Sequence, residues 1–289
     1  MILITGASGK TGIAIMRALR EKNIPVRAFI NKPQYQTAVI SAGASEVIIG
    51  NITNKQHITE ALNKIDAIYH ICPNMHPQEY QIGKNIISAC ESAGCRYFYY
   101  HSVYHPQIRK MPHHWQKMRV EARLFESKLQ FTVFQPTAYM QNIAAYWAQI
   151  EQGKYAIPYP VETRISLIDL EDLAQAVAQV LSQNTHQYAI YELVGTEPIS
   201  QIEIAAELSS QLGYKVAAES IPHGTWKLSA QKNGLSDYAI NTLLSMFNYY
   251  QNYGLKGNPS VLTYLLNRKP TGLVEYINKL IFSLRKQER

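Results

Sequence analysis

The residues that decide the fold stand at the start of the chain: Ile2-Leu3-Ile4-Thr5-Gly6-Ala7-Ser8-Gly9-Lys10-Thr11-Gly12. A short apolar run leads into a Gly-x-x-Gly-x-x-Gly turn, and a helical pattern follows it. Gly6 permits a tight turn, Gly9 lets the backbone approach a pyrophosphate, and Gly12 lets the helix pack closely. The helix start adds free N–H groups and a partial positive charge. The stretch predicts a dinucleotide site formed by Gly6, Ser8, Gly9, Lys10, Thr11 and Gly12.

The same stretch also resembles the end of a nucleoside-triphosphate loop, because Gly9-Lys10-Thr11 has the order Gly-Lys-Thr. That loop needs a second glycine five positions before Gly9, where this chain has Ile4. We therefore reject an ATP or GTP site.

The first half of the chain alternates short β-branched runs with longer helical patterns, which is typical of a parallel sheet. The expected strands are Ile2–Thr5, Val26–Ile30, Glu46–Gly50, Ala67–Ile71, Arg96–His101 and Phe131–Gln135. The expected crossover helices are Gly12–Lys22, Lys55–Lys64, Gln78–Gly94 and Met111–Lys128. Because the strands are nearly continuous apolar runs, we expect helices on both faces of the sheet. The fold class predicted is α/β, a doubly wound Rossmann-type parallel sheet.

The pattern changes after about Gly153, where the chain becomes mostly helical and has no phosphate loop of its own. The segments expected there are a loop at Ile157–Pro160, strands at Arg164–Ile168 and Ala189–Val194, and helices at Asp169–Ser182, Ser200–Leu212, Asp237–Tyr253 and Thr271–Leu284. The first of these helices is opened by Asp169 or Asp172, and the second is capped by Gly213. We expect a cofactor-binding domain over 1–152, to which 169–195 returns, and a smaller helical lobe over 153–289.

The end of the second expected strand indicates which dinucleotide binds. Sites that prefer NAD place an Asp or Glu there, but this chain reads Phe29-Ile30-Asn31-Lys32-Pro33. Lys32, helped by Lys10 and Arg27, can pair with a 2′-phosphate while Asn31 hydrogen-bonds to it. NADP is therefore favoured over NAD; the alternative is that Lys32 is an exposed turn lysine.

Composition narrows the partners and the compartment. The 289 residues carry 28 Lys+Arg and 21 Asp+Glu, a net charge of +7, but the basic residues are scattered, which does not favour nucleic acid. Three cysteines without a Cys-x-x-Cys pair indicate neither a disulfide framework nor a zinc site. With no apolar run long enough for a signal peptide or a membrane span, we expect a cytoplasmic protein that does not enter membranes.

Several further motifs accompany the glycine turn: Gly43-Ala44, Gly50-Asn51-Ile52-Thr53, Tyr69-His70-Ile71-Cys72-Pro73, His101-Ser102-Val103, His113-His114-Trp115-Gln116-Lys117, Phe131-Thr132-Val133-Phe134-Gln135-Pro136 and Tyr139-Met140-Gln141-Asn142. Together they resemble the NmrA-like family of atypical short-chain dehydrogenases, relatives of isoflavone and quinone reductases, over nearly the whole chain. The resemblance implies a bilobed NADP-binding protein. Family members divide between NADPH-dependent reductases and proteins that sense the cofactor's redox state without turnover.

The resemblance also implies positions for the cofactor. Asn51 and Ile52 are expected near the adenine, Cys72 and Pro73 along a ribose, and Lys117 at the nicotinamide ribose. The chain departs from the family twice: its usual Asp is Asn51 here, and its usual Arg after the second strand is Asn31.

Short-chain dehydrogenases pair a Ser with Tyr-x-x-x-Lys, since a Lys one helical turn from the Tyr lowers the phenol's pKa and holds the ribose. This chain keeps Ser102 and Lys117 but has His113 at the Tyr position. We expect His113 or Tyr104 to supply the proton. The alternatives are that His113 is an exposed helix residue while His114 and its neighbour point inward, that Ser102 caps a loop, and that Lys117 is solvated.

The expected substrate pocket contains Asn74, His76, Tyr104 and Tyr139. A metal site is not expected: no carboxylate or Cys stands at ligand spacing beside the histidines, and adjacent His113 and His114 should point away from each other on a helix.

Two hypotheses result. The first is an NADPH-dependent reductase of a small carbonyl, quinone or enone, because a reactive acceptor can take its proton from solvent. The alternative is a non-catalytic NADP(H)-sensing regulatory protein. A small-molecule substrate is the expected partner, with a homodimer or a regulatory protein as further possibilities.

Overall fold

The computed structural model describes residues 1–183 and 185–287, which divide into two compact units. Unit 1 comprises Met1–Pro136 and Leu173–Glu192, and unit 2 comprises Thr137–Asp172 and the chain from Leu193 onward. The first break thus follows Pro136, whereas the sequence led us to place it at 152.

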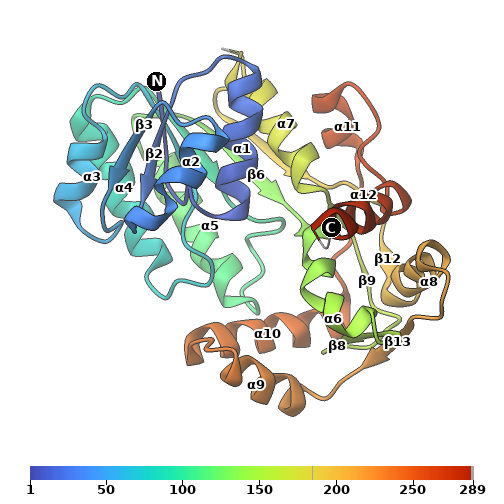
Figure 1. Cartoon of the computed structure of the whole chain (residues 1–289). Helices are drawn as coiled ribbons and strands as arrows, with labels where there is room; N and C mark the ends of the chain where they lie inside the picture. Colours follow the sequence, from blue (N-terminus) through green and yellow to red (C-terminus); the bar gives the residue numbers. More distant parts are fainter. Residues whose placement is uncertain (184, 288–289) are drawn as a thin grey trace. The chain divides into compact units, whose positions relative to one another are not determined.

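Unit 1 is built on a seven-stranded sheet with the order β11-β6-β5-β4-β1-β2-β3 (Figure 1). Its strands are β1 (Ile2–Ile4), β2 (Val26–Ile30), β3 (Glu46–Ile49), β4 (Ala67–His70), β5 (Tyr97–His101), β6 (Gln130–Pro136) and β11 (Ala189–Leu193). Neighbours from β3 through β6 pair in parallel. The expected doubly wound Rossmann-type sheet is confirmed, with each of the six expected strands within one residue at either end.

The helices of unit 1 cover both faces of this sheet. They are α1 (Lys10–Glu21), α2 (Gln36–Ala42) after the short turn η1 (Pro33–Tyr35), α3 (Lys55–Ala61), α4 (Glu79–Ala93), α5 (Pro112–Phe125) and most of α7 (Leu170–Leu181). One core cluster joins strand residues such as Leu3, Ile68 and Val133 to Ile86 of α4 and Leu124 of α5. Because successive strand residues alternate faces, Ile4 and its equivalents point to the opposite face of the sheet, where Ile4 is also buried.

Unit 2 contains three two-stranded sheets and most of the remaining helices. The strand pairs are β7 (Ala138–Tyr139) with β10 (Leu167–Ile168), β9 (Arg164–Ile165) with β12 (Ile199–Ser200), and β8 (Lys154–Ile157) with β13 (Ala217–Ser220). The helices are η2 (Met140–Tyr146), α6 (Trp147–Ile150), α8 (Gln201–Leu212), α9 (His223–Lys232), α10 (Asp237–Tyr253), α11 (Ser260–Leu266) and α12 (Leu273–Gln287).

Several expectations for this half need correction. The expected strand Arg164–Ile168 is two short strands, β9 and β10, and Ile157 ends β8 instead of opening a loop. The elements of unit 2 that were not predicted include β7, β8, β13, η2, α6, α9 and α11. The expected C-terminal cap of α8 is present, because Gly213 follows the helix in a left-handed conformation at φ 78°. At its start, Ser200 forms a capping box with Glu203, which was not predicted.

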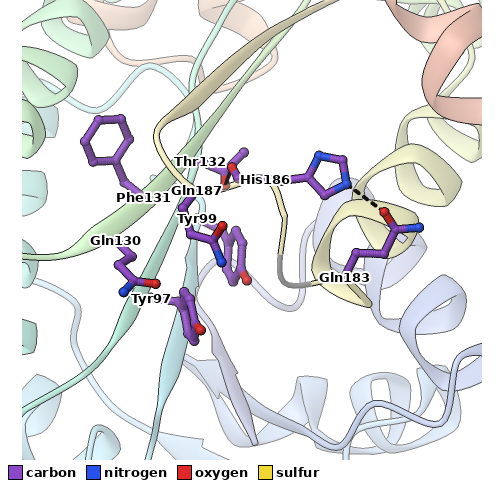
Figure 2. A pocket seen from close by; sticks show the side chains of 8 residues that line it. All are labelled: Tyr97, Tyr99, Gln130, Phe131, Thr132, Gln183, His186 and Gln187. Carbon is purple, nitrogen blue, oxygen red and sulfur yellow. Dashed lines mark hydrogen bonds between the residues drawn. The ribbon is translucent and has the colours of Figure 1, made fainter.

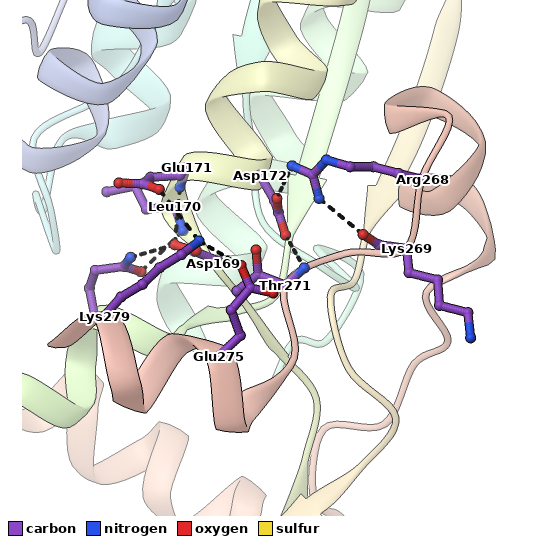
Figure 3. Close-up of polar contacts among 10 residues, drawn as sticks. Asp169, Leu170, Glu171, Asp172, Arg268, Lys269, Thr271, Glu275 and Lys279 are labelled. Atoms are coloured by element: carbon purple, nitrogen blue, oxygen red, sulfur yellow. Dashed lines mark hydrogen bonds and ion pairs between the residues drawn. The ribbon is translucent and has the colours of Figure 1, made fainter. Parts of the chain in front are cut away.

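A polar network in unit 2 joins the start of α7 to the segment between α11 and α12 (Figure 3). Asp169 Oδ1 accepts from the Glu171 N–H at 3.2 Å, so Asp169 opens α7. Asp172, the alternative opener, is buried and instead accepts from Arg268 at 2.6 Å and from the Thr271 N–H at 2.5 Å. A buried carboxylate is tolerated because it is paired and hydrogen-bonded.

Within the described residues, the structure has no helix with the length and apolar character needed to cross a bilayer.

Candidate functional site

The glycine turn follows β1 at the centre of the sheet, where the strand order reverses between β1 and β4. Gly6 has φ +62°, and a Cβ there would lie 2.9 Å from the Ile71 carbonyl oxygen. A Cβ on Gly12 would lie 2.6 Å from the Gly6 carbonyl oxygen. Only glycine therefore allows this turn and this close approach of α1. Open α/β sheets bind ligands at such a switch point.

The amino end of α1 is open to an anion. The first N–H groups of a helix lack intrahelical acceptors, and in α1 they belong to Lys10, Thr11 and Gly12. The N-cap residue is Gly9, so the helix start has no side-chain cap, and the first turn contains no acidic residue. Lys10 itself is exposed. The turn thus fits a pyrophosphate, which would receive the uncapped N–H groups.

Thr5 connects the two central strands at the same edge, a contact that the sequence analysis missed. Its hydroxyl donates to the Ile71 carbonyl oxygen at 3.1 Å, accepts from the Ile71 N–H at 3.0 Å, and shares a 2.8 Å hydrogen bond with His70 Nδ1. Burial, and then the charge of Lys117, lower the pKa of His70 to about 3. His70 is therefore neutral at pH 7.

At the end of β2, the structure leaves Asn31 and Lys32 exposed. The expectation that Arg27 helps Lys32 to bind a 2′-phosphate is corrected. The Arg27 guanidinium pairs with Glu46 at 2.6 Å and donates to the Ala61 carbonyl oxygen at 2.8 Å. In the next loop, Asn51 Oδ1 accepts from the N–H and hydroxyl of Thr53 at 3.0 and 2.8 Å, and Ile52 is partly buried.

Lys117 of α5 lies in unit 1 with a buried counter-ion. Its Nζ donates to Glu79 Oε1 at 2.5 Å and to the His101 carbonyl oxygen at 3.3 Å. The Glu79 side chain is 3% exposed and that of Lys117 is 15% exposed. The alternative of a solvated helix lysine is therefore wrong. Glu79 is the first residue of α4, and an acidic residue in a first helical turn is the signal that could have singled it out.

Ser102 follows β5 and is also engaged. Its hydroxyl donates to Glu121 Oε1, and Gln135 Nε2 donates to both Glu121 oxygens at 3.0 Å. Burial raises the pKa of Glu121, against the opposing effect of these hydrogen bonds. Glu121 stands four residues after Lys117 and so shares its helical face, a spacing that could have singled out Glu121 as a residue near Lys117.

His113 and His114 are both buried at the start of α5, so the idea that His113 is exposed is wrong. Their rings do not point away from each other: the centroids are 4.5 Å apart in an edge-on contact. This corrects our expectation, because two wide rings on adjacent positions still meet in a closely packed interior. Burial, then the charges of His114 and Lys117, hold the pKa of His113 well below 6.5. Within the described part of the chain, His113 Nδ1 has no hydrogen-bond partner.

Three of the expected substrate residues, Asn74, His76 and Tyr104, lie in unit 1, on the loops that follow β4 and β5. Tyr104 is buried and stacks on His105 at 3.8 Å, and burial raises its pKa. His76 accepts from the Gln78 N–H at 3.1 Å and so helps to start α4, while Asn74 is exposed beside it.

The remaining residues of the predicted cofactor and substrate sites lie partly in unit 1 and partly in unit 2. Pro73 is exposed in unit 1, and burial raises the pKa of the neighbouring Cys72 thiol well above 9. Tyr139 belongs to unit 2. Across residues 1–183 and 185–287, the structure contains no group of three or more His, Cys, Asp or Glu side chains able to hold a metal ion.

A shallow pocket with essentially no enclosed space lies elsewhere in unit 1 (Figure 2). Its lining residues are Tyr97, Tyr99, Gln130, Phe131, Thr132, Gln183, His186 and Gln187. Because Tyr97 and Gln130 begin β5 and β6, this pocket lies toward the amino ends of the strands. It contains none of the expected site residues and is separate from the glycine turn.

The sequence profile of the NmrA-like family matches residues 1–277. The chain belongs to the NmrA-like family. Its NmrA-like relatives include NAD(P)H azoreductase of Xenophilus azovorans, 27% identical over 75% of both chains. Quinone oxidoreductase 2 of Escherichia coli is 25% identical over 97% of this chain and 98% of its own.

Solved structures resemble the whole chain as well. The NADPH-dependent quinone oxidoreductase of Escherichia coli in complex with NADPH superposes with a TM-score of 0.85, at 24% identity over 97% of this chain and 100% of the other. Triphenylmethane reductase of Citrobacter sp. with NADP(H) gives a TM-score of 0.83 at 19% identity, over 96% and 99%. At these identities the structures establish a shared fold. The expected NADP agrees with the cofactors named for these proteins.

Proposed function

We propose that this protein is an NADPH-dependent oxidoreductase that reduces quinones or similarly electron-poor conjugated acceptors. The observation that carries the proposal is the glycine turn with its uncapped helix start at the β1–β4 switch point. The NmrA-like relatives named as quinone oxidoreductase and azoreductase support the same reading.

The exposed residues around the turn suit the phosphates of NADPH. The turn would hold the pyrophosphate on the N–H groups of Lys10 and its neighbours, and Lys32 and Asn31 would meet the 2′-phosphate. Phe29–Pro33 contains no carboxylate to favour a free 2′-hydroxyl. Asn51 and Ile52 would border the adenine.

A bound nicotinamide would supply a hydride, and the chain's own groups would orient the reactants. Lys117 would donate to the nicotinamide ribose. An ammonium has three N–H donors, and two acceptors among the described residues already contact Lys117 Nζ. One donor therefore remains for a ribose hydroxyl.

The buried histidines of unit 1 favour hydride acceptors that do not need a protonated side chain as proton donor. His70, His101, His113 and His114 all have a lowered pKa, chiefly because they are buried, so imidazolium is scarce at pH 7. Ser102 already donates to Glu121. A quinone that receives a hydride becomes a stabilised hydroquinone anion and can take its proton from water. Reduction of an ordinary ketone would need a proton donor at the alkoxide.

A second candidate function, an NADP(H)-sensing regulatory protein, is favoured by one observation: both residues of the Ser–Lys pair are already engaged by buried carboxylates. Such a protein would bind NADPH and NADP⁺ unequally and change its partner or shape accordingly.

The two functions differ in turnover. We would mix the purified protein with NADPH or NADH and a panel of quinones, azo dyes and simple ketones, and follow the loss of reduced-cofactor absorbance. We expect NADPH oxidation with quinones and a loss in kcat/KM on the order of 100-fold in Lys117→Met. Lys84→Met is the matched control, because Lys84 is an exposed lysine on α4. Tight NADPH binding without turnover of any acceptor would instead establish the sensor.

A further inference from the structure

Glu79 is a buried carboxylate that no expected site contained. It lies opposite Lys117, with Oε1 2.5 Å from Nζ, and its side chain is only 3% exposed. Its position at the start of α4 adds the partial positive charge of a helix amino end, which stabilises a carboxylate there.

The close packing of α4 and α5 creates this contact. A Cβ on Gly83 would lie 2.6 and 2.7 Å from the two methyl carbons of Val120, so the glycine lets the helices approach closely. Gly83 is four residues after Glu79, and Val120 is three residues after Lys117. Each pair therefore shares one helical face, and the approach at Gly83 brings carboxylate and ammonium together.

Glu79 is also the carboxylate available to neutralise Lys117. The second nearby carboxylate, Glu121, accepts from Ser102 and Gln135. The other titratable groups that the charge of Lys117 affects, or that lie beside it, are His70 on β4, Cys72 after β4, Tyr100 and His101 on β5, and His113 and His114 on α5. Burial keeps the four histidines neutral and raises the pKa of Cys72 and Tyr100, so these groups carry no compensating negative charge.

We propose that Glu79 is the positioning residue for Lys117 in cofactor binding. It fixes one of the amine's three donors while the His101 carbonyl oxygen accepts a second, so that the third is presented to the nicotinamide ribose. The inference rests on the proposed ribose contact of Lys117. Glu79 itself touches neither cofactor nor substrate.

The test replaces the charge and keeps the shape. Glu79→Gln retains a hydrogen-bond acceptor but removes the buried counter-ion, so the ammonium is held less firmly. NADPH affinity is measured by cofactor fluorescence in the wild type, in Glu79→Gln, in Lys117→Met and in the double variant, with the melting temperature measured in parallel. The Glu79→Gln variant should bind NADPH about tenfold more weakly than the wild type does.

A purely structural role would lower the melting temperature and weaken NADPH binding equally with and without the Lys117→Met substitution, and that result would overturn the proposal. In the double variant with Lys117→Met, Glu79→Gln should cause no further loss, because the group it positions is gone. If Glu79→Gln does not fold, Glu79→Asp is measured instead. Its shorter side chain keeps the charge but moves the carboxylate away from Lys117, so NADPH affinity should fall, and wild-type affinity in this variant would refute the positioning role.

The failure of this inference is distinguishable from failure of the proposed function. If Lys117→Met binds NADPH as well as the wild type does, the ribose contact is wrong. If Lys117→Met weakens binding while Glu79→Gln leaves it intact, only the role of Glu79 is wrong.

Discussion

At the scale of single residues, burial sets the charge of His70. Its pKa is lowered from 6.5 to about 3. Between these two pH values the imidazole is protonated in the unfolded chain but stays neutral in the folded chain. The stability that His70 contributes is therefore complete above about pH 6.5 and is lost as the pH falls toward 3, at up to about 1.4 kcal/mol per pH unit. Denaturant unfolding of the wild type between about pH 7 and pH 5 should show this loss.

His70→Asn is the matched variant, since its amide can still hydrogen-bond to Thr5 but does not titrate. We expect the free energy of unfolding of this variant to depend less steeply on pH, whatever its absolute stability. An unchanged slope would mean that His70 is not kept neutral by folding.

At the scale of secondary-structure elements, the contact between α4 and α5 depends on the absence of a side chain at Gly83. Gly83→Ala would place a methyl group against Val120, whose branched side chain is stiff. We expect a loss of about 1–3 kcal/mol in the free energy of unfolding, measured by chemical denaturation. Adding Val120→Ala should relieve the clash and recover part of the loss, although it removes buried methyl groups.

Gly224→Ala is the control for helix propensity. Gly224 is the second residue of α9, and a Cβ there meets nothing within 4 Å. This variant should be as stable as the wild type or slightly more so. If Gly83→Ala behaved in the same way, the close approach of the two helices would not depend on glycine.

At the scale of the whole molecule, the net charge of +7 bears on the capture of an anionic cofactor. A positive protein attracts NADPH, and salt screens that attraction. Stopped-flow association of NADPH should slow by about threefold or more between about 20 and 200 mM salt. The KM for an uncharged quinone, measured at saturating NADPH, should change little. Equal salt dependence of both quantities would indicate a general effect of salt on the protein instead of electrostatic attraction.

The sequence predicted best those features that depend only on neighbouring residues, such as tight turns and buried strands. The glycine spacing at Gly6 and Gly12 and the apolar strands of unit 1 predicted the sheet correctly, because a parallel sheet under helices needs continuous apolar runs. The short strands of unit 2 were harder to recognise. The two-residue strands β9 and β10 are too short to show an alternating pattern.

The hydrogen-bond partners in the candidate site were harder to predict from the sequence than the fold was. The reason is that the charges in the site depend on side chains that are far apart in the chain. The sequence singled out Ser102, His113 and Lys117, but it assigned none of them a partner. Glu79 and Lys117 are 38 positions apart, and Thr5 and His70 are 65 apart.

The fold class, the glycine turn after β1 and the likeness to the NmrA-like family could thus be read from the order of the residues alone. Which of the singled-out side chains are buried, neutral or paired became known from the three-dimensional structure. The reason is that a turn is set by the backbone preferences of a few consecutive residues, whereas charge and hydrogen bonding depend on which helices and strands meet in three dimensions.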